Sequence, residues 1–367
     1  MALNLDQLLD HPLLTLPLDW NKEGYKSYDD AVNRIGQSYL NLLRQLEGSA
    51  ISGSTEYIGE HDKNSLLLVA EKVLEAVSRS LRFYLQEGNP YLATEALREA
   101  FVFKKDLPHA EQPNFCIGTY PLYPRQYRLR IIDACDPWGI FHVPFEKRQW
   151  IESSRYSIPG HPTLYMSRSV LTAYKEMGPN PYEKTFVSEY RFTAKDHHSE
   201  YLVDMMNRPA SDDLGDIYRY LARWPLVMAC NMKVNEPDLP FKPEYVLPQM
   251  VFQWVKTKYK IGGRPIVGVL YPSTKVSKTD RDLLEYHANT AIPARNVSLT
   301  GHCPVLGSMF NWTSPYSFTE LLKRQGLKEP VPARSGEFYE KYDRYRLSDF
   351  GQIEEALNEI PFHTELK

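Results

Sequence analysis

An apolar stripe in the first third of the chain restricts the fold more than any other feature. Large and small apolar side chains recur there every three or four residues, at Leu66, Ala70, Val73, Val77, Leu81 and Tyr84. This spacing is that of one face of an α-helix, and Gly88 marks its end. A face of this size must be buried against other apolar surface, so the sequence predicts a packed helical layer.

Two flanking segments supply the partners for this helix. Ser27 can cap a first helix, with Asp30 in place of the usual glutamate of a capping box. Its apolar positions are Val32, Ile35, Tyr39, Leu43 and Leu46, and a loop of small residues follows from Gly48 to Gly59. A third helix is predicted from Asn89 and Pro90. None of the three carries a catalytic constellation, so we expect a scaffold or a regulatory layer.

A linker rich in Pro, Asn and Gly is predicted between Leu107 and Pro124, and strands follow it. The predicted domains are residues 1–111, helical, and residues 112–367, with a mixed sheet, which makes the fold class α/β (α+β). The expected strands are Tyr127–Ile132, Thr163–Met166, Phe186–Phe192, Ile266–Tyr271 and an apolar strand within Trp224–Val234. Helices are expected around Met250–Val255 and Gly351–Leu357.

Composition limits the partners. The net charge of −3 gives no electrostatic reason to expect nucleic acid, and no apolar run is long enough to span a bilayer. The N-terminus lacks the basic start and apolar core of a signal peptide, and four scattered cysteines are typical of reduced thiols in the cytoplasm. No cluster has the spacing of metal ligands, so no metal is expected.

The stretch from Arg155 to Gly178 concentrates chemically useful residues. A turn is predicted at Pro159-Gly160, then the strand with Tyr165, then a helix capped by Ser167 or Ser169. This helix would carry Glu176 and end at Gly178. A cation, an aromatic ring and an acid so close together indicate a pocket for a charged, planar ligand. The alternative is a surface arginine, a core tyrosine and a solvated glutamate.

Two other groups have open interpretations. Arg128 and Arg130 lie on one face of the predicted strand, where they are either solvated or the floor of an anion site. Glu244 is a rival carboxylate, but it lies just before a helix, where an acid often only favours the helix N-terminus.

The order and spacing of several blocks resemble the RES domain, a family named for an arginine, a glutamate and a serine. The resemblance covers the chain roughly from Cys116 onward. The blocks are Arg155-Tyr156-Ser157-Ile158-Pro159-Gly160, Leu164-Tyr165, Glu176, Pro243-Glu244-Tyr245 and Tyr271-Pro272-Ser273. The family implies a fold similar to the ADP-ribosyltransferases, NAD as the substrate, and a toxin role with a cognate antitoxin as a partner.

By position, the resemblance implies one role for each matching residue. The site would comprise catalytic Glu176, Tyr165 and Arg128, and substrate-binding Arg155, Tyr156 and Ser273. Two departures concern packing: Ser154 stands where a glycine commonly precedes the arginine, and Ala173-Tyr174 replaces a Cys-Trp-like pair.

The chemistry of NAD cleavage suits these residue types. Nicotinamide leaves as a neutral group, so the barrier lies in an oxocarbenium-like ribose, which Glu176 would stabilise. Tyr165 would stack on nicotinamide, the two arginines would bind the pyrophosphate, and Ser273 would donate to a phosphate or ribose oxygen.

The expected function is therefore that of an NAD glycohydrolase, phosphorylase or ADP-ribosyltransferase. The acceptor, whether water, phosphate or a protein, stays open, as does the oligomeric state. One alternative is a nucleotide-binding interaction protein without turnover. Another is a toxin that acts on nucleic acid, which the acidic balance and the lack of a nuclease motif disfavour.

Overall fold

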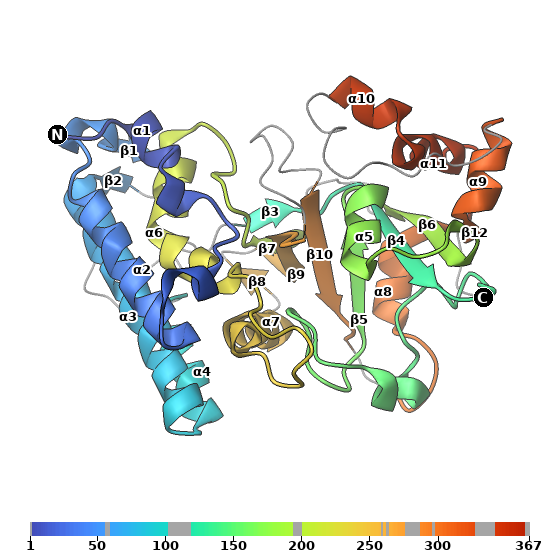
Figure 1. Cartoon of the computed structure of the whole chain (residues 1–367), viewed down its shortest axis with the longest axis horizontal. Coiled ribbons are helices and arrows are strands. Elements are labelled where there is room, and N and C mark those ends of the chain that lie inside the picture. The colour runs from blue at the N-terminus through green and yellow to red at the C-terminus, as the bar shows by residue number, and fades with distance from the viewer. Residues whose placement is uncertain are drawn as a thin grey trace. The chain divides into compact units, whose positions relative to one another are not determined.

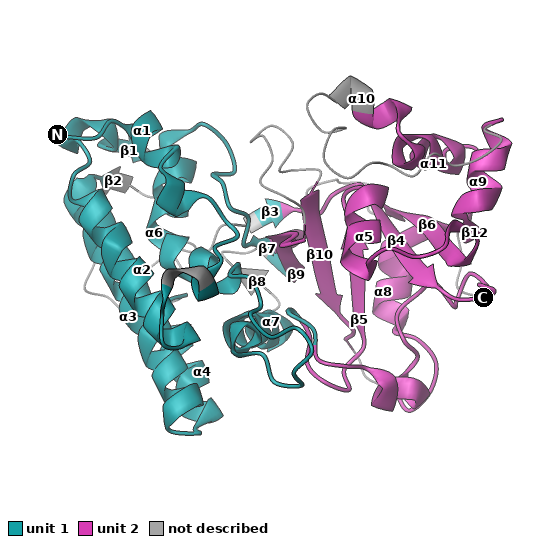
Figure 2. Ribbon diagram, viewed as in Figure 1, with its two compact units in different colours: residues 1–120, 154–156, 203–266 teal, residues 121–153, 157–202, 267–367 magenta. Residues whose placement is uncertain are grey.

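The computed structural model describes residues 2–55, 59–101, 119–193, 200–257, 260–261, 264–275, 287–295, 298–326 and 342–363. It divides into two compact units (Figure 2). Unit 1 comprises residues 1–120, 154–156 and 203–266, and unit 2 comprises residues 121–153, 157–202 and 267–367. The predicted boundary at residue 111 lies outside the described residues, and the N-terminal unit also takes up a later segment of the chain.

Unit 1 is mainly helical (Figure 1). Its α-helices are α1 (Leu5–Leu9), α2 (Tyr28–Leu43), α3 (Lys63–Leu81), α4 (Pro90–Arg98), α6 (Leu214–Cys230) and α7 (Val246–Thr257). Its shorter elements are η1 (Pro12–Leu14), η2 (Trp20–Glu23), η3 (Gly48–Ala50), η4 (Arg82–Gln86) and η7 (Pro243–Tyr245), with strands β1 (Gly53–Thr55), β2 (Gly59–His61) and β8 (Lys260–Ile261).

The three N-terminal helices confirm the sequence prediction. The Ser27 and Asn89 side chains cap α2 and α4, as expected. The stripe on α3 is buried, with Leu66, Val73 and Val77 fully enclosed. The predicted loop after Gly48 differs, because β1 and β2 pair there as a short antiparallel hairpin.

The predicted strand within Trp224–Val234 is wrong, because this segment ends α6. An apolar run that is buried on all sides has no periodicity that separates strand from helix. Pro225 lies inside the helix and cannot donate to the carbonyl of Leu221, four residues earlier. The Tyr39 hydroxyl of α2 donates to that carbonyl at 2.6 Å, so a distant residue stabilises the interrupted turn.

Unit 2 is built on an antiparallel sheet with helices packed on it (Figure 1). Its strands are β4 (Arg125–Ile131), β5 (Thr163–Ser167), β6 (Thr185–Phe192), β10 (Ala288–Pro293), β11 (Phe310–Thr313), β12 (Tyr316–Ser317) and β13 (Phe362–His363). Its helices are η5 (Phe145–Trp150), α5 (Val170–Met177), η6 (Tyr182–Lys184), α8 (Pro304–Met309), α9 (Phe318–Arg324), α10 (Tyr342–Leu347) and α11 (Asp349–Leu357).

The hydrogen-bonded strand order in unit 2 is β13-β11-β6-β4-β5-β10-β9, with β12 on β6. Most of β9 (Arg264–Pro272) belongs to this unit, whereas the division between the units cuts through β3 (Thr119–Pro121) and β7 (Tyr201–Asp204). The chain combines helices with a sheet, so its fold class is α+β. The order brings β5 between β4 and β10, which come from distant parts of the sequence.

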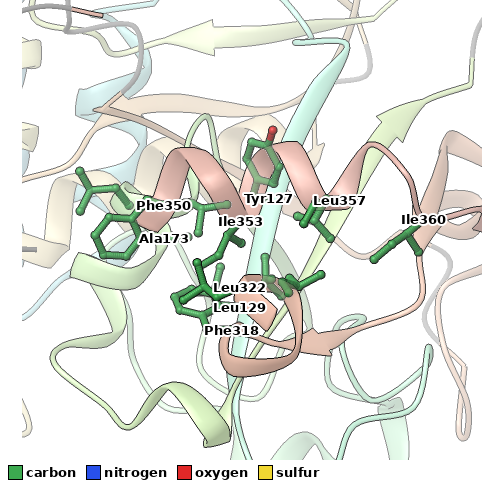
Figure 3. Packing of buried hydrophobic residues seen from close by; sticks show 14 of the residues in the cluster. Tyr127, Leu129, Ala173, Phe318, Leu322, Phe350, Ile353, Leu357 and Ile360 are labelled. Atoms are coloured by element: carbon green, nitrogen blue, oxygen red, sulfur yellow. The ribbon is translucent and has the colours of Figure 1, made fainter. Parts of the chain in front are cut away.

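Helix α5 follows the sequence prediction closely. The Ser169 hydroxyl accepts from the Thr172 amide at its start, and Gly178 ends it with a φ of 83°. One side of α5 packs with α9, α11 and β4 in a buried cluster (Figure 3). The sticks in Figure 3 show Ala173 near Phe350, and Leu129 near Leu322 and Phe318. Packing against the sheet and against α9 and α11 therefore holds α5 in place.

Gly351 sets the sharp corner between α10 and α11. A Cβ at this position would lie 2.3 Å from the Tyr345 carbonyl oxygen, a main-chain atom that cannot move aside cheaply. We expect Gly351→Ala to lower the free energy of unfolding by about 1–3 kcal/mol, as overpacking does. Urea unfolding would measure it, with the exposed Glu355→Ala as the control. A loss equal to that of the control would contradict the close approach.

Candidate functional site

Polar side chains gather on the face of the sheet that α5 covers. Residues directly opposite each other in paired strands share a face. Ser167 of β5 lies opposite both Tyr127 of β4 and Asn289 of β10, and Asn289 lies opposite Tyr271 of β9. Tyr127 belongs to the buried cluster beneath α5, so all four side chains are on that face. We call this surface the α5 face.

The carboxylate of Glu176 is held on the α5 face by Asn289. The Asn289 Nδ2 atom donates to Glu176 Oε1 at 2.7 Å, and the Ser167 hydroxyl donates to Asn289 Oδ1 at 2.6 Å. Because a carboxylate only accepts, Glu176 sets the orientation of the Asn289 amide, and the Ser167 hydroxyl donates to the other end. Asn289 and Ser167 are buried, whereas Glu176 is partly exposed. The acid is therefore fixed in position while part of it remains accessible.

Ser273 is linked to Glu176 through Lys275. Its hydroxyl accepts from the Lys275 amide at 3.2 Å, and Lys275 Nζ donates to the Glu176 carbonyl at 2.8 Å. The Ser273 amide also donates to the carbonyl of His287 at 2.8 Å. The two predicted residues thus share one end of the sheet, as a common site requires.

His287 adds a neutral hydrogen-bonding group beside these residues. Its Nδ1 lies 3.3 Å from the Thr172 hydroxyl of α5. Burial, with a smaller contribution from the Lys175 charge, lowers the pKa of His287 to about 4. The imidazole is therefore uncharged near neutral pH and supplies no cation to the site.

Tyr165 and Arg128 lie on opposite faces. Tyr165 is two positions from Ser167 on β5, so it shares the α5 face, where it is partly buried. Arg128 is next to Tyr127 on β4 and therefore points to the other face. Among the described residues, β4 and β5 pair only at Tyr127 and Ser167.

Arg128 spans the point where these two strands diverge. Its Nε donates to the Ile140 carbonyl at 2.7 Å and its Nη1 to the Tyr165 carbonyl at 2.8 Å. Burial, with a smaller effect of the nearby Arg130, lowers the pKa of Arg128 to about 9. Arg130 donates to the Phe141 carbonyl at 3.1 Å. Both guanidinium groups thus bind main-chain oxygens, so the solvated alternative of the two open interpretations does not apply.

Arg155 and Tyr156 belong to unit 1, and both are buried. Arg155 Nη1 donates to the Cys230 carbonyl at 2.9 Å and Nη2 to the Met232 carbonyl at 3.0 Å. The Cys230 carbonyl is one of the terminal acceptors of α6, where a cation is also favoured by the helix dipole, and Met232 follows two residues later.

Glu244, the rival carboxylate, is also buried in unit 1. Its Oε1 accepts from Trp20 Nε1 at 3.1 Å and from the Asn235 amide at 2.9 Å. This agrees with a structural position at the start of η7 and α7.

The structure therefore brings Glu176, Ser273 and Tyr165 to one face of unit 2 but does not add Arg128 to them.

Sequence reasoning missed Asn289, His287 and Thr172. The available signal was the pair His287 and Asn289, two polar residues at strand spacing with Ala288 between them. The sequence predicts Ser167, the partner of Asn289, only as an alternative helix cap, a role that Ser169 takes. The contact with Glu176 joins residues 113 positions apart, so local pattern could not reveal it.

Two further findings concern the described parts of the chain only. No group of three or more His, Cys, Asp or Glu side chains there is arranged to hold a metal ion. No helix among the described residues has both the length and the apolarity to cross a membrane.

Comparison with known proteins gives one informative match. The chain is 26% identical over 331 residues to a Bacillus subtilis (strain 168) protein named "Putative toxin YopC", covering 83% of this chain and 73% of that one. No protein-family profile matches the chain. No solved structure matches it either. The similarity supports a toxin-like relationship.

Proposed function

We propose that this chain is a RES-type enzyme that consumes NAD and acts as a toxin. The observation that carries the proposal is the fixed carboxylate of Glu176, which Asn289 and Ser167 hold at one end of the α5 face. Ser273 and Tyr165 lie on the same face, which provides the acid, the aromatic ring and the hydroxyl that the proposed reaction needs. The name of the Bacillus subtilis relative supports the toxin role.

The proposed reaction breaks the bond between the nicotinamide nitrogen and C1′ of the ribose. The bonding electron pair leaves with the nitrogen, so the pyridinium becomes neutral nicotinamide and positive charge develops on the ribose. Glu176 stabilises this charge and accepts a hydrogen bond from a ribose hydroxyl. An acceptor then adds at C1′; water gives ADP-ribose and loses one proton.

The arginines act as supports in this proposal. Arg128 holds the Tyr165 carbonyl and with it the strand that presents the tyrosine ring. Arg128 and Arg155 each use two of their five N–H donors on main-chain carbonyls. The alternative function, nucleotide binding without turnover, needs the same face but does not need an ionised Glu176.

Expression in a heterologous bacterial host tests the proposal. Cellular NAD should fall before growth stops, and Glu176→Gln should abolish both effects at equal protein levels. A growth arrest with unchanged NAD would overturn the proposal, and so would equal NAD loss in the variant.

Asn289→Asp should make NAD turnover strongly pH-dependent. Two carboxylates within hydrogen-bonding distance share one proton near neutral pH, because both cannot ionise together. Turnover should be reduced on the order of tenfold at pH 6 and recover as the pH rises. Asn289→Leu, which removes the tether without adding a charge, should lower turnover by the same factor relative to the wild type at every pH. Steady-state kinetics from pH 6 to pH 9 would measure it; parallel profiles for both variants would exclude charge coupling to Glu176.

A further inference from the structure

Glu354 connects the C-terminal helix α11 to the first residue of α5. Its Oε1 accepts from the Val170 amide at 2.8 Å and from the Tyr345 hydroxyl of α10. Its own main-chain carbonyl accepts from Arg125 Nη2 of β4 at 3.1 Å. A single residue therefore links α5, α10 and β4, all within unit 2.

Helix α5 is held by hydrogen bonds at both ends. Val170 begins the helix and binds Glu354, and Glu176 lies near its end and binds Asn289. Between these ends α5 packs on α11, through side chains that include Ala173 and Ile353 (Figure 3). A helix this short moves as one rigid piece, so a change at its start displaces its end.

We propose that Glu354 is a positioning residue that fixes α5, and thereby Glu176, in a manner that depends on pH. The effect on catalysis rests on the proposed NAD-consuming function. The effect on α5 itself does not.

Several charged and titratable groups face Glu354. They are Tyr345 of α10, Arg125 and Tyr127 of β4, Arg168 between β5 and α5, and Glu189 of β6, which pairs with Arg125. Burial raises the pKa of Glu354 to about 7, although the Tyr345 hydroxyl, the Val170 amide and the two arginines oppose the rise. The carboxyl group thus changes charge close to neutral pH.

Ionisation has two consequences of opposite sign. The raised pKa means that the protonated form stabilises the fold, fully below the ordinary value of 4.5 and progressively less as the pH rises through about 7. The ionised form is nevertheless the stronger acceptor for the Val170 amide, and it lies at the positive end of the α5 dipole. The hydrogen bond from the Val170 amide to Glu354 therefore becomes stronger above neutral pH.

The first test follows the Val170 amide without any NAD. In the full chain labelled with ¹⁵N-valine, this signal should titrate with a midpoint near pH 7. The isosteric Glu354→Gln should abolish the titration, whereas the exposed neighbour Glu355→Gln should keep it. Tyr345→Phe keeps the carboxylate but removes a donor that lowers its pKa, so the midpoint should move to higher pH. An unchanged titration in Glu354→Gln, or an unmoved midpoint in Tyr345→Phe, would overturn the proposal.

The second test measures NAD turnover as a function of pH. We expect kcat of the wild type and of Glu355→Gln to rise about threefold to tenfold between pH 6 and pH 8, at unchanged KM. Glu354→Gln should stay at the low value throughout. A wild-type profile in Glu354→Gln would refute the positioning role. If the wild type consumes no NAD, the proposed function fails, while the Val170 titration still decides whether Glu354 controls α5.

Discussion

Glu176→Gln should reduce NAD turnover by a factor of about 10²–10³, the usual loss on removing one group that stabilises a transition-state charge. The glutamine is isosteric and can still meet Asn289, so NAD binding and the unfolding midpoint should change little. Only the negative charge beside the ribose is lost. Single-turnover release of nicotinamide, alongside the dissociation constant for NAD, would measure the effect.

A matched control for Glu176→Gln is Glu183→Gln. Glu183 is an exposed carboxylate in η6, a few residues further along the chain. It should retain wild-type turnover. Near-normal turnover in Glu176→Gln would instead mean that this carboxylate does not stabilise the reacting ribose.

The second large effect is expected in unit 1, at the buried ion pair between Asp204 and Arg223. Their side chains are 2% and 5% exposed, and Arg223 Nη2 lies 2.7 Å from Asp204 Oδ2. Asp204 Oδ1 also accepts from the Met206 amide at 2.8 Å. Asp204→Ala leaves a buried guanidinium without its counter-charge, so it should cost about 3–5 kcal/mol of unfolding free energy.

The exposed pair of Arg44 and Glu71, in the same unit, provides the control. It has a similar separation of 2.6 Å, but both side chains are more than 40% exposed. Glu71→Ala should therefore change stability by no more than about 1 kcal/mol. Urea unfolding of both variants would compare them. Equal losses of unfolding free energy in the two variants would show that burial does not determine how much the Asp204–Arg223 pair stabilises the fold.

Local chemistry was enough to predict the elements that have clear ends. Ser27, Asn89 and Ser169 cap helices in the structure, and Gly178 ends α5, because caps and positive φ depend on neighbouring residues only. The apolar run of α6 lacked such information, since burial on all sides removes the helical period.

The site could be predicted only in part for a related reason. The pattern of the Arg155–Gly178 stretch indicates Glu176 and the resemblance implies Ser273, and Lys275 links the two in the structure. Their supporting residue Asn289 lies on a strand whose register is set by distant partners. The carbonyls that Arg155 binds are likewise 75 and 77 residues away along the chain. Such contacts depend on tertiary packing, which no local pattern encodes.

Product analysis tests the central claim most directly. The purified full chain should be incubated with NAD, with and without inorganic phosphate, and the products identified by chromatography and mass spectrometry. The account predicts free nicotinamide, accompanied by ADP-ribose, by its phosphorylated form when phosphate is present, or by ADP-ribose attached to protein. NAD that remains intact under all conditions, while the protein is folded, would contradict it.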